Sequence, residues 1–188
     1  MYRRIFDIEK QLDEAMFLFG ARQVGKSTLL KERFPDAIFY DLLKSDIRRR
    51  LKRNPEILRE ALSGKPEGTL VIVDEIQKVP DLLDEVHSLM VENKLRFILS
   101  GSSARKLKRS GANTLGGRAQ NRTLFPLVWP EVTDFEIDRA VQNGMIPRHY
   151  TVDDAIDRLE SYVDIYLREE IQEEALVQDI DTFTRFLE

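Results

Sequence analysis

The chain has 188 residues with a formal net charge of −4, and 42% of them are hydrophobic, which suits one soluble globular domain or one and a part. The absence of cysteine excludes disulfides and thiolate metal sites. With no run of 18 apolar residues and an N-terminus too charged for a secretory signal, we expect no membrane association and a cytoplasmic location.

Short apolar runs bounded by glycine or acidic residues predict strands that are buried on both faces. They are "EAMFLFG", "DAIFYDLL", "GTLVIVDE" and "LRFILSG", with "RTLFPL" as a weaker fifth. Helical patterns lie between them, for example "VPDLLDEVHSLMVE", whose apolar residues recur at steps of three and four. Alternating strands and helices favour an α/β fold with a parallel sheet of about five strands flanked by helices. We assign residues 1–150 to this domain.

The character of the sequence changes at Thr151, where "TVDD" fits a helical capping box. One apolar helical stripe follows at Leu159, Tyr162, Val163, Tyr166, Leu167 and Ile171. The amphipathic pattern runs to the last residue without a polar tail. We therefore expect residues 151–188 to be a helical segment, the truncated start of a lid or of a C-terminal region, or an edge that packs on a partner.

"GARQVGKST" fits the phosphate-loop pattern G-x-x-x-x-G-K-[ST] at Gly20, Gly25, Lys26 and Ser27. A predicted strand precedes it and a predicted helix follows it, so backbone N–H groups and a helix N-terminus would face an anion. Lys26 would reach the β- and γ-phosphates, and the Ser27 hydroxyl would hold Mg²⁺. The alternative, a flexible turn with an exposed lysine, does not explain this order of elements.

"TLVIVDEIQKVP" ends a predicted strand in two carboxylates. Asp74 would hold the Mg²⁺ ion, and Glu75 would orient or deprotonate the attacking water. The alternative is that one or both carboxylates cap the following helix. A glutamate directly after the metal-binding aspartate favours hydrolysis over phosphoryl transfer to another molecule. Guanine specificity usually needs the motif N-K-x-D, and the nearest match, "NKLR", has arginine at the fourth position, so ATP is favoured over GTP.

Two further groups of side chains follow along the chain. The hydroxyls of Ser100 and Ser102, in "FILSGSS", can hydrogen-bond the attacking water or the γ-phosphate, or simply cap a helix. Arg118, in "LGGRAQ", can neutralise charge on the γ-phosphate of a neighbouring subunit, or pair with a surface carboxylate. The first of these Arg118 roles predicts self-association.

The motifs together resemble a group of prokaryotic AAA-type P-loop ATPases with a "DEIQ" Walker B sequence. "GARQVGKSTLL", "VIVDEIQKVPDLLDEVHSLM", "FILSGSS", "LGGRAQNRTLFPLVWPE" and "YVDIYLREEI" occur in the order seen there. Members of that group carry a C-terminal domain of unknown function and are about twice this long, so the resemblance implies that this chain is the N-terminal ATPase part. It also implies Mg²⁺ and water handling by Asp74 and Glu75, and nucleotide contacts at Gly20, Ala21, Arg22, Gln23, Val24, Gly25, Lys26, Ser27 and Thr28.

The function that we expect is Mg²⁺-dependent ATP hydrolysis that switches or drives an attached module. Two alternatives stay open. One is a small-molecule kinase, and the other is a nucleic-acid-binding module gated by ATP. The basic run "DIRRRLKRNP" gives the second some support, but it carries no interleaved aromatic residues for base stacking.

Overall fold

The computed structural model describes residues 2–8, 15–102, 107 and 115–167. Contacts divide the chain into two compact units. We call residues 4–21 and 25–125 the sheet unit, and residues 1–3, 22–24 and 126–188 the helical unit. Each unit is described by itself below.

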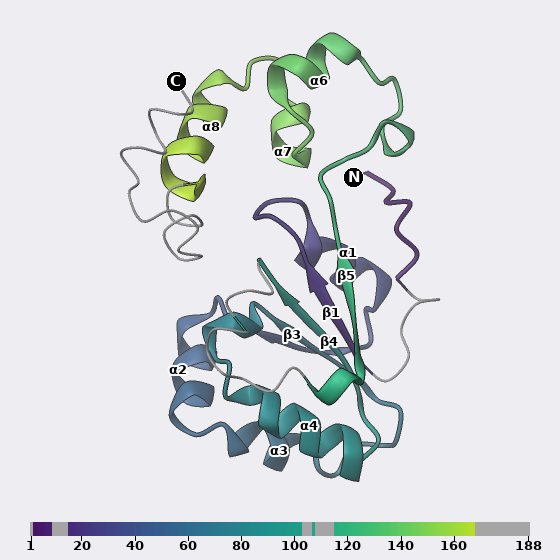
Figure 1. Cartoon of the computed structure of the whole chain (residues 1–188), viewed down its shortest axis with the longest axis vertical. Helices are drawn as coiled ribbons and strands as arrows, with labels where there is room; N and C mark the ends of the chain where they lie inside the picture. The colour runs from purple at the N-terminus through teal and green to yellow at the C-terminus, as the bar shows by residue number, and fades with distance from the viewer. Residues whose placement is uncertain (1, 9–14, 103–106, 108–114, 168–188) are drawn as a thin grey trace. The chain divides into compact units, whose positions relative to one another are not determined.

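The sheet unit is built on a five-stranded parallel sheet in the order β2-β3-β4-β1-β5. Figure 1 labels four of these strands, β1, β3, β4 and β5. Its strands are β1 (Ala15–Phe19), β2 (Ile38–Asp41), β3 (Leu70–Asp74), β4 (Arg96–Gly101) and β5 (Ala119–Thr123). The predicted α/β class and parallel sheet are thus confirmed, as are four of the five strand positions. β1, β3 and β4 are the most apolar strands, and they occupy the three central places, where both faces are covered.

The predicted position of the fifth strand is wrong. "RTLFPL" covers residues 122–127, whereas β5 runs from Ala119 to Thr123 and pairs with β1 alone. A strand at the edge of a sheet exposes one side to solvent, and the sequence of β5, "AQNRT", is accordingly polar. A search for continuous apolar runs therefore does not find it. The apolar residues that suggested a strand begin where β5 ends.

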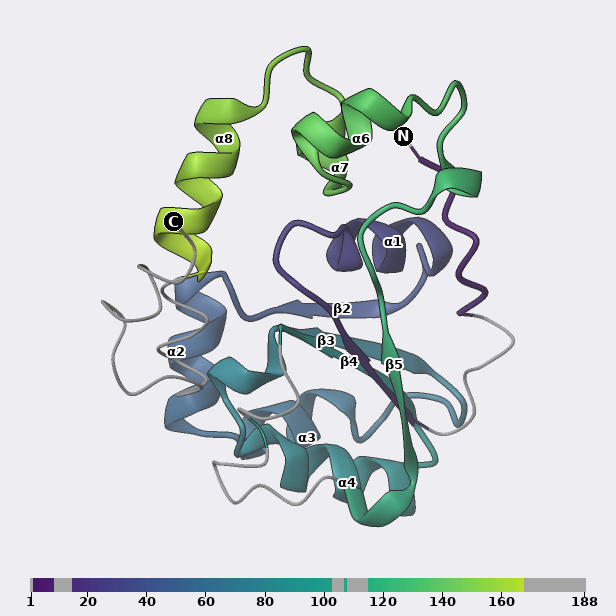
Figure 2. The same ribbon diagram turned by 45° about the horizontal axis from the view of Figure 1, so that its top comes forward.

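Helices cover the sheet on both faces, α1 on one and α3 and α4 on the other (Figure 2). Where the structure describes this unit, its helices include α1 (Lys26–Arg33), α2 (Ser45–Arg53), α3 (Glu56–Leu62) and α4 (Leu82–Glu92), with short 3₁₀ turns η2 (Ile76–Lys78) and η3 (Leu115–Gly117). The helices predicted after the phosphate loop and over "VPDLLDEVHSLMVE" are confirmed.

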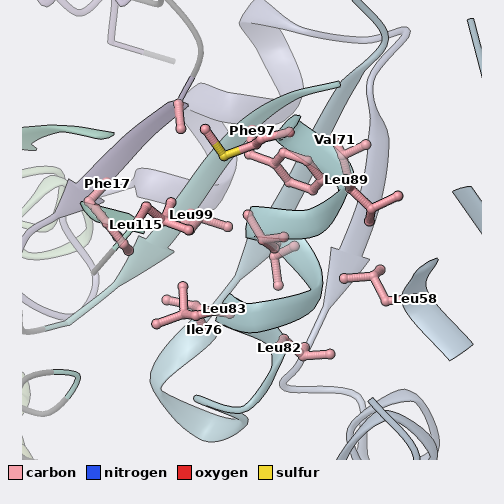
Figure 3. Packing of buried hydrophobic residues seen from close by; sticks show 14 of the residues in the cluster. Phe17, Leu58, Val71, Ile76, Leu82, Leu83, Leu89, Phe97, Leu99 and Leu115 are labelled. Carbon is pink, nitrogen blue, oxygen red and sulfur yellow. The ribbon is translucent and has the colours of Figure 1, made fainter. Parts of the chain in front are cut away.

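Strand residues at alternate positions and one stripe of α4 form the main core (Figure 3). Phe17, Val71, Phe97 and Leu99 point from the strands, and Leu82, Leu83, Val86 and Leu89 point from α4; all are nearly inaccessible to solvent. Burying each such side chain contributes about 1.5–3 kcal/mol. This core fixes β3 and β4 side by side, which matters for the site below.

The helical unit contains η4 (Trp129–Glu131), α6 (Ile137–Asn143), α7 (Pro147–Tyr150), α8 (Ile156–Ser161) and a π-helical turn η5 (Tyr162–Leu167). Leu127, Val132 and Tyr150 form a small core. No helix in the described part of the chain is long and apolar enough to span a membrane.

The capping box expected at Thr151 is not formed. Thr151 ends α7 and its hydroxyl donates back to the carbonyl of Arg148 at 3.2 Å. The next helix begins five residues later, and the carboxylate of Asp154 accepts from the N–H of Ile156 at 3.0 Å. A Thr side chain can serve either end of a helix, so the sequence pattern alone did not fix which end it serves.

His149 is the one buried histidine among the described residues, at 3% exposure. Its ring meets the edge of Tyr162 at a centroid distance of 5.5 Å, and its Nδ1 has no hydrogen-bond partner within the described chain. Burial, and then the nearby charge of Arg158, lower the pKa of His149. The folded chain therefore binds this proton less readily than the unfolded chain does.

It follows that the free energy of unfolding should fall as pH drops below about 6.5, the ordinary histidine value, because protons then favour the unfolded state. One such group contributes a slope of at most about 1.4 kcal/mol per pH unit. Denaturant unfolding between about pH 7.5 and about pH 5.5 measures it. His149→Phe should remove this loss and His87→Gln should keep it; an undiminished loss in His149→Phe would contradict the assignment.

Candidate active site

The register of the sheet brings several of the predicted site residues to one edge. Leu18 of β1, Ser100 of β4 and Asp74 of β3 are cross-strand neighbours. Since all strands are parallel, their carboxyl ends meet there, and neighbouring strands lie about 4.8 Å apart. The loop that leaves β1 at Gly20 therefore starts beside the ends of β3 and β4. This carboxyl edge is where open α/β sheets bind ligands.

The loop leads directly into α1, whose N-cap is Gly25. Gly25 adopts a left-handed conformation with φ 95°, which glycine tolerates far better than other residues. No side chain caps α1, and its first turn carries no acidic residue. The N–H groups of a first helical turn lack carbonyl partners one turn earlier, so they can bind an anion, which the helix dipole also favours.

Lys26 is buried although it carries a charge, with an exposure of 5%. Its ammonium group donates to the carbonyl of Gly20 at 2.7 Å and to that of Ala21 at 3.0 Å. These bonds fold the lysine back across the loop that contains it. The alternative of a turn with an exposed lysine is therefore wrong, because the side chain lies inside the loop.

Asp74, at 1% exposure, is the buried carboxylate of the edge. Ser27 Oγ donates to its Oδ2 at 2.5 Å, and Ser100 Oγ donates to its Oδ1. Hydroxyl and carboxylate oxygens are ligands that Mg²⁺ prefers, commonly with one or two protein ligands beside phosphate and water. Ser27 and Asp74 therefore fit a magnesium ion, and the described residues contain no cluster of three or more acidic or histidine side chains that would form an all-protein metal cage.

Glu75 lies one residue beyond β3 in a left-handed conformation, φ 63° and ψ 43°. Its carboxylate accepts from Gln77 Nε2 at 2.5 Å and makes no capping hydrogen bond to η2. Asp74 is likewise engaged by serines. The alternative that these two carboxylates serve as helix caps is therefore wrong. A non-glycine residue held in this conformation costs about 1 kcal/mol or more and commonly marks a functional position.

The remaining predicted residues lie in different places. Ser102 Oγ is 3.4 Å from Gln77 Nε2, so it belongs to the same group of side chains. Arg22, Gln23 and Val24 fall in the helical unit, and Thr28 is exposed on the first turn of α1.

Arg118 is exposed and precedes Ala119, which is the partner of Ala15 at the amino end of β1. The length of β1 separates that edge from the loop by roughly 13 Å. Within one chain Arg118 therefore lies away from the phosphate loop.

Three residues of the site were missed by sequence reasoning. Gln77 contacts Glu75 and Ser102, and Gly101 lies against Gln77. Arg4 places a guanidinium nitrogen 3.9 Å from where a Cβ of Gly25 would be. The "DEIQ" spacing was the one sequence signal for Gln77; nothing local in the sequence marks the other two.

The chain is similar to known proteins in its sequence and in its fold. Residues 12–133 match the model of a family described as AAA domain. No curated protein matches the chain.

Among solved structures, the Walker-type ATPase PABY2304 of Pyrococcus abyssi is similar, with a TM-score of 0.54, 15% identity, and coverage of 85% of this chain and 70% of that one. The Orc1 protein of Aeropyrum pernix in complex with DNA has a TM-score of 0.42 at 15% identity over 63% of this chain and 41% of that one. A signal transduction ATPase with numerous domains from Pyrococcus horikoshii has 0.41 at 16% identity over 82% and 26%. Because the Pyrococcus abyssi ATPase is only 15% identical to this chain, its similarity shows the fold alone.

We expect Gly25→Ala to lower the free energy of unfolding by about 1–2 kcal/mol, the cost of the left-handed conformation for an L-residue. The new Cβ would meet Arg4 Nη1 at 3.9 Å, an ordinary contact, so the cost comes from the backbone and not from a clash. Denaturant unfolding measures it. Gly64→Ala is the matched control, because Gly64 has no positive φ and no atom within 4 Å of its Cβ position, and it should stay within about 0.5 kcal/mol of wild type. Equal stability of the two variants would contradict the claim.

Proposed function

This chain belongs to the AAA domain family and is an AAA-type ATPase, and from that premise we propose that it binds and hydrolyses Mg-ATP at the carboxyl edge of its sheet. The observation that carries the proposal is the pair of hydrogen bonds from Ser27 and Ser100 to Asp74, which join the phosphate loop to two strand ends. The use of hydrolysis to switch or drive an attached module is part of the same proposal.

In the proposed reaction each side chain has a separate task. The N–H groups at the start of α1 and the Lys26 ammonium would bind phosphate oxygens. Ser27 and Asp74 would hold Mg²⁺, which when bound neutralises charge on the β- and γ-phosphates. Glu75 would accept a proton from the attacking water or orient it, since its carboxylate is at the same edge and only partly buried.

Ser100 has a supporting task in this proposal. Its hydroxyl is fully buried and is committed to Asp74, so it would fix that carboxylate and not touch phosphate itself. Ser102 is partly buried and is linked to Glu75 through the side-chain amide of Gln77. Of the two serines, Ser102 is therefore the better candidate for a contact to water or to the γ-phosphate.

A second candidate function has one observation in its favour. On α2, Arg49, Arg50, Lys52 and Arg53 are exposed, while Leu51 is buried. These cations could meet phosphates of a nucleic acid whose binding ATP controls. That candidate predicts ATP-dependent binding that weakens steeply as salt rises, whereas binding that does not respond to salt would count against it.

The first test is phosphate release from Mg-ATP. Wild type should turn over. Lys26→Ala should lose nucleotide binding by at least about tenfold because a buried cation is removed, and Glu75→Gln should bind ATP but lower kcat by about a hundredfold or more. Titration of ATP binding on the same samples separates an effect on nucleotide affinity from an effect on the rate of hydrolysis.

Three outcomes decide the assignment. Equal ATP binding by all three proteins with no phosphate release would remove the proposed site. Phosphate release that appears only when a small-molecule acceptor is added would identify a kinase. Removal of Mg²⁺ by a chelator should abolish turnover, and retained turnover would remove the metal roles of Ser27 and Asp74.

We also propose that Arg118 acts across two copies of the chain, since the phosphate loop of its own chain follows the carboxyl end of β1 and Arg118 lies near the amino end. Specific activity should then rise with protein concentration, and Arg118→Ala should lower kcat and lose that dependence. Arg122→Ala, which removes a half-buried arginine from the adjoining strand β5, is the control. An unchanged rate and unchanged concentration dependence in Arg118→Ala would exclude the role.

A further inference from the structure

Gln77 contacts the proposed base more closely than any other described side chain does. It lies two residues beyond Glu75, in the 3₁₀ turn that follows β3. Its Nε2 donates to Glu75 Oε2 at 2.5 Å and lies 3.4 Å from Ser102 Oγ. One amide group thus joins the end of β3 to the residue just beyond β4.

The orientation of this amide follows from its partners. An ionised carboxylate can only accept hydrogen bonds, so the nitrogen of Gln77 must face Glu75. The amide oxygen then points the other way. It is buried and has no hydrogen-bond partner among the described residues. Within the described residues, the Gln77 amide thus keeps its nitrogen on Glu75 while its buried oxygen has no partner, and such a buried polar group calls for a specific explanation.

Gly101 provides the space for that oxygen. A Cβ built on Gly101 would lie 2.4 Å from Gln77 Oε1, well inside contact distance. Gly101 has no positive φ, so its backbone conformation does not by itself require glycine. The absence of a side chain at position 101 is explained by the Gln77 amide alone.

We propose that Gln77 is a positioning residue that holds the Glu75 carboxylate in its left-handed turn and aims it at the attacking water, and that Gly101 is glycine to make room for it. This inference rests on the proposed function, because it assigns to Gln77 the orientation of the base used there. Gln77 would touch neither the nucleotide nor the reacting atoms, and it would act through Glu75. Its loss should change the rate of chemistry and leave ATP binding intact.

Two variants displace the amide by independent routes. Gln77→Met keeps a similar length and removes the donor. Gly101→Ala leaves Gln77 in the chain but occupies the place of its amide oxygen, which can move because it ends a flexible side chain. Each should lower kcat at least about tenfold, since small displacements of a catalytic group have effects of this size, while the Kd for ATP stays within about twofold. Gln142→Met, on exposed α6, and Gly64→Ala are the controls and should keep wild-type kcat.

A double variant separates positioning from a general structural role. In a Glu75→Gln background, Gln77→Met should cause no further loss of kcat, because the group that it positions is already gone. A merely structural Gln77 would lower kcat again in that background and would weaken ATP binding and thermal stability together. If Gln77→Met does not fold, Gly101→Ala decides the question with Gln77 intact.

The outcomes separate this inference from the proposed function. If wild type releases phosphate in a Lys26-dependent manner while Gln77→Met and Gly101→Ala keep kcat within about twofold, the positioning role is overturned and the ATPase site stands. If wild type releases no phosphate, both are overturned. Loss of ATP binding in Gln77→Met with normal folding would also overturn the role, because it would place Gln77 on the nucleotide.

Discussion

The geometry of the candidate site, at the carboxyl ends of the strands, depends on one buried carboxylate, that of Asp74. Asp74 is almost fully enclosed, and a buried charge is costly unless it is hydrogen-bonded. Ser27 from α1 and Ser100 from β4 supply those bonds, each worth about 1.5–3 kcal/mol because the acceptor is charged. A slip of β3 by one residue against β4 would turn Asp74 to the other face and leave both serines without it. Sheet register and site geometry are therefore the same constraint, and the apolar core under β3 and β4 maintains both.

Next to this well-satisfied carboxylate, the following turn is locally unfavourable. Glu75 has positive φ, and the amide oxygen of Gln77 is buried without a described partner. Together these features cost on the order of 2–4 kcal/mol. The dense packing of α4 beneath the turn, through Leu82 and Leu83, supplies a comparable amount from two side chains (Figure 3). Stability from the core thus supports a strained turn, as at many active sites.

An element or a site residue could be predicted from the sequence when the residues that determine it are neighbours in the chain. Central strands are continuous apolar runs because both faces are buried, and the phosphate loop is a contiguous motif, so both could be read from the sequence. The edge strand β5 carries a polar sequence, and its limits came from pairing with β1. Gln77 and Gly101 meet only because β3 and β4 lie side by side, a relation that no window of sequence contains. The location of Arg118 at the amino edge likewise follows from register and not from its neighbours in the chain.

The position of Lys26 adds a step to this account. Its ammonium donates to the carbonyls of Gly20 and Ala21, so in the proposed site an incoming triphosphate would compete with those bonds. The exchange would replace bonds to neutral carbonyls with bonds to charged phosphate oxygens, which are roughly twice as strong. The lysine also stays beside the loop and is not free in solvent, so less side-chain entropy is lost on binding. The two bonds would have to be exchanged, but because they hold the lysine at the loop they would reduce the side-chain entropy that is lost when a nucleotide binds.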